Sequence, residues 1–214
     1  MRSRVSHRLK QDAVAKALAG HHLSVLQTAA QSGLVQLKYL DESGVCLWSP
    51  ASYSYSPIGQ QKRLEQSERR GARVSILGLW SPEECFDYAL VTGGYNAERY
   101  IEVMDQAAAK AARVFTESAR LTFVIQDNCS IHRAESVQQR WPLWQQQGLF
   151  VVFLPPYCSE LNLIEGQWHQ IKTHELAGRM FDYEDELIEA IVDAIDDRAQ
   201  RGRYTAEHLL INYA

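Results

Sequence analysis

Three acidic residues stand at positions where carboxylates could work together. Asp41 follows the β-rich run of residues 35–40, Asp127 follows the run 121–126, and Glu165 lies in the first turn expected of a later helix. In α/β proteins, functional sites gather at the ends of strands. Carboxylate oxygens are hard ligands that suit Mg²⁺ or Mn²⁺. If the elements that carry them lie side by side, the three acids can form one site for divalent cations.

Each of these acids also has an ordinary structural interpretation. Asp41 could open the turn of a hairpin, because Asp is frequent at the first position of turns. Asp127 and Asn128 could cap the helix that follows them. Glu165 lies three residues after Asn162, so the two could form a pair similar to a capping box. Taken singly, none of the acids identifies a site.

The first half of the chain predicts a helix followed by antiparallel strands. Residues 7–31 are rich in Ala, Leu, Lys and Gln, which favours a helix with an interruption near Gly20. We expect a hairpin next, with strands over residues 35–40 and 45–49 and its turn at residues 41–44. A polar loop over residues 50–71 then leads to two further β-rich runs, at 73–80 and 86–93.

The second half alternates helices and strands. Apolar residues repeat at helical spacing from Ala97 to Val114 and lead into the buried strand 121–126. The sequence then predicts four elements: a polar helix with Trp141 and Trp144 near its end, a buried strand over 149–155, a helix that starts near Asn162, and an acidic helix over about 183–199. Together with the first half, this order predicts an α/β fold, a mixed sheet with helices on both faces.

Four segments around the acids carry a more specific signal: LDESGV (40–45), YSYSPIGQ (53–60), VIQDNCSIHRA (124–134) and LPPYCSELNLIEGQWHQIK (154–172). They resemble, in order, the signature blocks of mariner-like bacterial insertion-sequence transposases of the D-D-E superfamily. The resemblance covers about residues 30 to 205 and implies a ribonuclease-H-like fold. It assigns the acidic triad to Asp41, Asp127 and Glu165, with 37 residues between the last two.

The resemblance implies a metal-dependent DNA endonuclease and strand transferase. Such an enzyme hydrolyses a phosphodiester at the element ends and joins the freed 3′ hydroxyl to target DNA. This chemistry uses two Mg²⁺ or Mn²⁺ ions about 3.5 to 4 Å apart, one to activate the attacking oxygen and one to stabilise the leaving oxygen. Three clustered carboxylates would hold them.

Further residues near the triad are candidates for DNA contact. Asn128 and His132 either touch a DNA phosphate or order the loop; the alternative is a helix cap and a surface histidine. Lys172 shares a helix face with Glu165 and His169, so it could reach a phosphate, although a solvated lysine is the simpler interpretation. The loop before residue 73 holds a basic cluster that either contacts the DNA backbone or is solvated; its members are Lys62, Arg63, Arg69, Arg70 and Arg73.

The chain also departs from the family pattern. It has Tyr157-Cys158-Ser159 where the family often has Tyr-Ser-Pro, and Ser159 does not fix φ as proline would. Two alternatives therefore stay open. The chain could be a catalytically impaired remnant that binds DNA or a full-length transposase, or it could be a ribonuclease-H-like nuclease of another kind.

Composition limits the class of protein and its organisation. The net charge of −4 is uneven, because residues 182–197 carry eight acids and no Lys or Arg, which leaves basic surfaces elsewhere. No run is long and apolar enough to span a bilayer, and no signal peptide is evident, so we expect a cytoplasmic, nucleoid-associated bacterial protein with reduced cysteines. We predict a helical lead-in over residues 1–31 and a catalytic domain over 32–214. The family's N-terminal helix-turn-helix region has no counterpart, so the expected partners are DNA and either a second copy of the chain or a separate helix-turn-helix protein.

Overall fold

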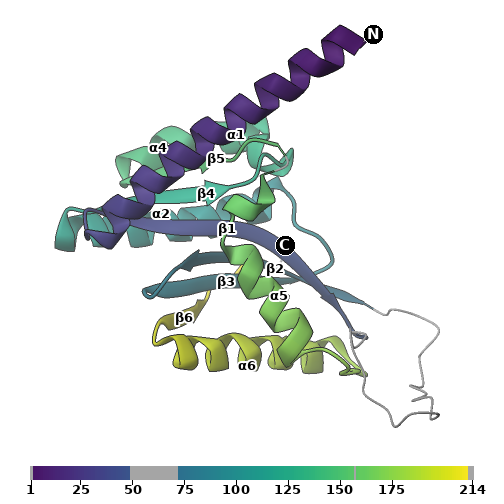
Figure 1. Ribbon diagram of the computed structural model, residues 1–214. Coiled ribbons are helices and arrows are strands. Elements are labelled where there is room, and N and C mark those ends of the chain that lie inside the picture. The colour runs from purple at the N-terminus through teal and green to yellow at the C-terminus, as the bar shows by residue number, and fades with distance from the viewer. Residues whose placement is uncertain (1, 49–71, 157, 212–214) are drawn as a thin grey trace.

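A six-stranded mixed sheet forms the centre of the protein, in a computed structural model that describes residues 2–48, 72–156 and 158–211 (Figure 1). The strands are β1 (Val35–Cys46), β2 (Arg73–Ser81), β3 (Cys85–Thr92), β4 (Leu121–Gln126), β5 (Leu149–Phe153) and β6 (Thr205–His208). Their order across the sheet is β5-β4-β1-β2-β3-β6. The first three strands pair antiparallel, while β4 and β5 extend the sheet in parallel from β1, and β6 pairs in parallel with β3.

Helices cover both faces of this sheet, as predicted. They are α1 (Arg2–Gln31), α2 (Ala97–Ser118), α3 (Glu135–Gln138), α4 (Trp141–Gln146), α5 (Ile164–Gln170) and α6 (Glu184–Gly202). One apolar core joins the sheet to α1, α5 and α6, and a second joins its other face to α2, α3 and α4. In Figure 1, α5 accordingly lies in front of the sheet and α2 behind it.

The predicted hairpin at the start of the sheet is wrong. Residues 41–44 form no turn; they continue β1, which runs unbroken for 12 residues. Tyr39 pairs with β4 on one side and with β2 on the other, and from there to Cys46 only the ladder with β2 continues. Asp41 thus lies within the strand, opposite Gly78 of β2. On its other side the pairing with β4 has already ended at Tyr39. Residues 41–44 are of types that favour turns, but their continuous antiparallel pairing with β2 keeps them in the strand.

The interruption predicted at Gly20 is also wrong, because α1 passes through it. A Cβ at Gly20 would meet no atom within 4 Å, so the position lies on an open face of the helix. The helix ends instead at Gln31, and Gly33 follows with a φ of +70°, the left-handed conformation that is common just after helices.

Between β4 and β5 the structure replaces the expected polar helix with three short pieces: a 3₁₀ turn at Ile131–Arg133, then α3, then α4. Pro142 in the first turn of α4 explains the break, since proline has no amide hydrogen and favours helix starts. Strand β5 is shorter than predicted and only half-buried, because it forms the edge of the sheet. The edge strand β6 and a π-helical turn at Ile171–Glu175, which continues α5, were not predicted.

Candidate active site

The three predicted acids line one cavity of about 390 Å³. Asp41 lies in β1, Asp127 directly follows β4, and Glu165 lies in the first turn of α5. Strands β1 and β4 are parallel neighbours, so their carboxyl ends lead to the same edge of the sheet. The rest of the lining comes from the loops after β4 and β5: Asn128, Cys129, Leu154, Pro155, Pro156, Cys158, Ser159 and Asn162.

Buried contacts at its start fix the position of α5 relative to β1. Asn162 is 4% exposed, and its side-chain amide donates a hydrogen bond of 2.9 Å to the Leu40 carbonyl, next to Asp41. Ile164 and Trp168 pack into the core on the same side of the sheet. The alternative interpretation of Asn162 and Glu165 as a side-chain capping pair is therefore wrong: the Glu165 amide donates to the backbone oxygen of Asn162, and the Asn162 side chain bonds to β1. This contact helps to hold Glu165 in the lining of the cavity.

The described residues just before α5 make local contacts without the proline that the resembling family often has. Cys158 is 3% exposed, and its thiol contacts the Pro156 carbonyl at 3.7 Å. Ser159–Leu161 then form a 3₁₀ turn that leads to Asn162. All four cysteines are free thiols, as predicted.

The pKa of Asp41 reflects its burial and the acids around it. Burial, the largest cause, and the nearby Glu165, Asp127 and Glu42 carboxylates together raise the pKa of Asp41 to about 6, against the opposing effect of a backbone hydrogen bond. A negative charge at Asp41 is thus costly when no cation is near. A divalent ion would remove this cost.

The pKa of Asp127 is shifted in the opposite direction. Its pKa is lowered first by its contact with His132, whose Nδ1 lies 2.9 Å from Asp127 Oδ1. Burial acts against this effect, and the Cys129 amide, which donates to the same oxygen over 3.1 Å, lowers the pKa further. Asp127 is therefore maintained as a carboxylate.

His132 is a buried residue, so its interpretation as a surface histidine is wrong. It is 3% exposed, its ring centroid lies 4.6 Å from that of Tyr100, and its Nε2 lies 3.9 Å from Glu42 Oε1. The structure thus favours the loop-ordering role over phosphate contact. Asn128 is half-buried and does not cap the 3₁₀ turn, whose N-cap is Ser130. Its Oδ1 is a buried acceptor with no partner among the described residues.

Of the predicted basic residues that the structure describes, Lys172 lies near the acids, and Arg73, at the start of β2, lies within electrostatic reach of Lys172 and Glu42. Lys172 is half-buried in the π-helical turn after α5, and its pKa is lowered by burial and by Arg73, while Asp41 acts in the opposite direction. Lys62, Arg63, Arg69 and Arg70 lie outside the described residues, and their DNA contacts stay a prediction.

A sequence profile described as DDE superfamily endonuclease matches residues 36–188 of the chain. The chain belongs to this family. All three acids of the cavity fall within the matched stretch. A search of curated protein sequences gives no significant match.

Solved structures similar to this DDE family member show the fold. The Mos1 mariner paired end complex with Mn superposes with a TM-score of 0.65 at 19% identity, covering 91% of this chain and 61% of that chain. The paired end complex with Mg gives 0.63 at 20%, covering 90% and 58%. The catalytic domain of Mos1 mariner transposase gives 0.58 at 16%, covering 91% of each chain. The ribonuclease-H-like architecture is thus confirmed, and the chain spans about three fifths of the Mos1 chains in the complexes.

The donor set of this cavity fits hard divalent cations. Three carboxylates come from three separate segments, and the unpartnered Asn128 Oδ1 adds a further oxygen nearby. In the described parts of the chain, no three His, Cys, Asp or Glu side chains are already gathered closely enough to enclose an ion. The carboxylates would therefore draw together around cations, which would offset the burial and the neighbouring negative charges that raise the pKa of Asp41.

Several residues that support the acids could not be recognised from the sequence. Tyr100 lies on α2, far along the chain, yet it packs on His132 and donates a hydrogen bond of 2.8 Å to the buried Gln126. Glu42 adds a fourth carboxylate beside the triad. Only its place directly after Asp41 could have drawn attention to it.

None of the described helices is long and apolar enough to cross a membrane.

Proposed function

We propose that this chain is the catalytic domain of a DNA transposase, in which Asp41, Asp127 and Glu165 hold two divalent cations. One observation carries the proposal: three acids far apart in the sequence line a single cavity, in a chain of the DDE endonuclease family. Similar structures include Mos1 complexes with Mn, with Mg and with a transposon end, and a Mos1 strand transfer complex. They support Mg²⁺ or Mn²⁺ as the ions and DNA as the substrate.

Asp127, Asp41 and Asn162 have different roles in cation binding. Asp127, kept ionised by its contact with His132, offers a permanent carboxylate for a cation. Asp41 gives up its proton more readily when a cation binds, because the ion offsets the surrounding negative charge. Asn162 keeps Glu165 opposite these two acids by tying the start of α5 to β1. When bound, the ions would activate the attacking water or 3′ hydroxyl and stabilise the leaving oxygen.

Cations also account for the approach of DNA to an acidic cavity. Four carboxylates lie close together here, and their negative charge by itself would repel a phosphate. Lys172, half-buried within the electrostatic reach of Asp41, supplies a positive group on the α5 side. We assign it to the phosphate next to the scissile one.

The wider context of the reaction follows from the same proposal. The freed 3′ hydroxyl would join target DNA, and the basic residues of 62–70 would contact the DNA backbone. A second copy of the chain, or a separate helix-turn-helix protein, would bring the element ends together. A cytoplasmic, nucleoid-associated location in a bacterium stays a prediction.

Nicking of supercoiled plasmid DNA with Mn²⁺ tests the proposal. We expect the wild-type chain to nick, and Asp127→Asn and Glu165→Gln to lose nicking while keeping their fold. Asp193→Asn, an exposed acid on α6, is the matched control and should nick like wild type. Nicking that survives Asp127→Asn would refute the assignment. DNA binding without cleavage in any metal would favour the non-catalytic remnant, and a preference for RNA–DNA hybrids would favour the ribonuclease-H-like nuclease.

A further inference from the structure

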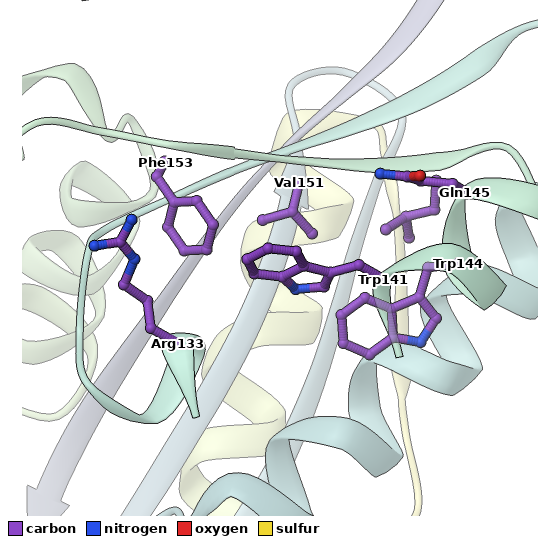
Figure 2. Close-up of a pocket in the computed structure, with 7 residues that line it drawn as sticks. Arg133, Trp141, Trp144, Gln145, Val151 and Phe153 are labelled. Atoms are coloured by element: carbon purple, nitrogen blue, oxygen red, sulfur yellow. The ribbon is translucent and has the colours of Figure 1, made fainter. Parts of the chain in front are cut away.

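Cations near the acids differ in whether a described residue already holds them. Arg133 directly follows His132, and its guanidinium lies 5.4 Å from the centroid of the Phe153 ring. Figure 2 shows the two side by side in an aromatic cavity beside β5, which shares no lining residue with the cavity of the acids. The side chains of Arg73 and Lys172 form no ion pair or hydrogen bond with any described residue. Of these three cations, Arg73 and Lys172 are therefore the ones available to an anion.

The side chain of Arg73 crosses from β2 to β1. In the ladder between the two strands, Arg73 lies opposite Cys46, and Gly44 is the diagonal neighbour two residues along β1. A Cβ at Gly44 would overlap Nε, Nη2 and Cζ of Arg73, so the guanidinium rests directly on the backbone of Gly44. Arg73 is nevertheless exposed to solvent. Glycine at position 44 thus leaves the space in which this guanidinium lies.

This arrangement directs Arg73 towards the acids on one face of β1. Residues two apart on a strand share a face, so Glu42 and Gly44 share that of Leu40, which packs in the core with α2. Burial and Asp127 raise the pKa of Glu42, whereas His132 and Arg73 act in the opposite direction. Arg73 therefore lies within electrostatic reach of Glu42 without forming an ion pair with it.

Lys172 approaches the same part of β1 from the other face. It lies in the π-helical turn that continues α5, and such turns are frequent at functional sites. Helix α5 packs in the core with Tyr39 and Val45, whose face of β1 Asp41 shares by alternation. Burial and Arg73 lower the pKa of Lys172, whereas Asp41 acts in the opposite direction. Two cations that repel one another here are costly, and an anion beside both would remove this cost.

The two cations flank a stretch of β1 whose outer edge has no strand beside it among the described residues. Pairing with β4 ends at Tyr39, and residues 41–46 pair with β2 alone. Asp41, which lines the cavity of the acids, stands at the start of this stretch. Gly44 follows three residues later, about 10 Å along the strand at about 3.3 Å per residue. That distance equals about three nucleotides of duplex, at about 3.4 Å each.

We propose that Arg73 and Lys172 bind the phosphate backbone of the DNA strand from the two faces of this edge, within about three nucleotides of the reacting phosphate. The inference rests on the function proposed above, and it adds Arg73 and Gly44 to the site. A guanidinium can bind one phosphate through two parallel hydrogen bonds. Because Arg73 already lies on Gly44, it has fewer orientations to lose when a phosphate binds. The two cations offset the repulsion between DNA and the acids on both faces of β1.

Binding of a short DNA duplex, with Ca²⁺ in place of Mn²⁺ to prevent cutting, tests the site. Fluorescence anisotropy at several salt concentrations gives both the Kd and its salt dependence. Arg73→Ala should bind about tenfold more weakly, the scale of one lost charged hydrogen bond. Its slope of log Kd against log salt concentration should fall by about one, the loss of one phosphate contact. Lys172→Ala should act in the same direction, whereas Arg113→Ala, an exposed arginine on α2, should do neither.

Gly44→Ala separates the position of the guanidinium from its charge. The added methyl group must displace the end of the flexible Arg73 side chain. Gly44 does not have a positive φ, so alanine should not lower the Tm. The variant keeps every charge, yet it should lose most of the affinity that Arg73→Ala loses. In the Arg73→Ala background it should have no further effect. Gly94→Ala, whose methyl group enters open space, is the matched control and should bind like wild type.

Two results would overturn the inference. One is wild-type affinity and salt slope in Arg73→Ala together with a lower Tm, because Arg73 would then serve the fold through Glu42 and not the DNA. The other is wild-type binding by Gly44→Ala, because the guanidinium would then act from any position.

The two proposals fail in different ways, because binding in Ca²⁺ requires no cutting. A chain that nicks DNA with Mn²⁺, but whose Arg73→Ala and Gly44→Ala variants bind like wild type, would keep the transposase proposal and lose the phosphate site. A chain whose two variants bind weakly, but which shows no metal-dependent nicking, would do the reverse.

Discussion

Replacing Asp41 with Asn should make the metal-free protein more stable at neutral pH while removing its activity. The pKa of Asp41 is raised from 3.8 to about 6 in the folded chain, chiefly by burial and then by neighbouring carboxylates. The folded state therefore holds its proton more tightly than the unfolded state does. Stability falls as the pH rises from about 4 to about 6, and the deficit persists at higher pH.

The size of this deficit follows from the shift in pKa. A difference of about two pH units corresponds to about 3 kcal/mol, at about 1.4 kcal/mol for each unit. This is an upper value, because relaxation around the charge reduces it. The substituted amide carries no charge, so the Asp41→Asn variant should recover up to this amount above pH 6. For a chain of this size, it corresponds to a rise in Tm of about 6 to 12 °C.

Thermal unfolding in EDTA at several pH values measures the effect. The stability gain of Asp41→Asn over wild type should be largest above pH 6 and should shrink as the pH falls towards 4. Saturating Mn²⁺ should reverse the order, because cation binding stabilises the wild-type fold and the variant lacks one ligand. A variant that is no more stable than wild type in EDTA at pH 8, or equally stabilised at every pH, would refute the electrostatic reasoning.

Two further predictions concern the support of the acids. Gly78→Ala would place a Cβ 2.6 Å from the ring of Trp168, so it should cost about 1 to 3 kcal/mol in urea unfolding and displace α5 enough to slow nicking, whereas Gly166→Ala, with no atom within 4 Å, should leave both intact. His132→Ala removes the main cause that lowers the pKa of Asp127, so the acid limb of the nicking profile should move to higher pH; an unmoved limb would show that this contact does not govern Asp127.

The sequence was informative where local pattern and function agree. The apolar run of residues 121–126 predicted β4 with its bounds, and so placed Asp127 at the end of a strand. The apolar spacing after residue 162 predicted the helix of Glu165. At Asp41 the two disagree, because turn-forming residues occupy a strand that β2 holds by an unbroken ladder. Such conflicts between local preference and fold are expected at functional sites.

Other features depend on contacts between distant segments, which local pattern does not reveal. His132 is buried because Tyr100 of α2 packs on it, and nothing in the polar stretch around it indicates burial. Strand β6 is too short for a clear alternation and forms by pairing with β3. The amide of Asn162 is directed to β1, and the cap that its position suggested does not form. These contacts became visible only with the sheet assembled.

The central claim is that three acids from separate segments form one binding site for divalent cations. Calorimetric titration of the wild-type chain with Mn²⁺, alongside Asp127→Asn, Glu165→Gln and the exposed control Asp193→Asn, tests it most directly. We predict that wild type and the control bind two ions, and that each triad variant loses at least one of them. Binding by Asp127→Asn and Glu165→Gln that matches wild type in affinity and stoichiometry would contradict the account.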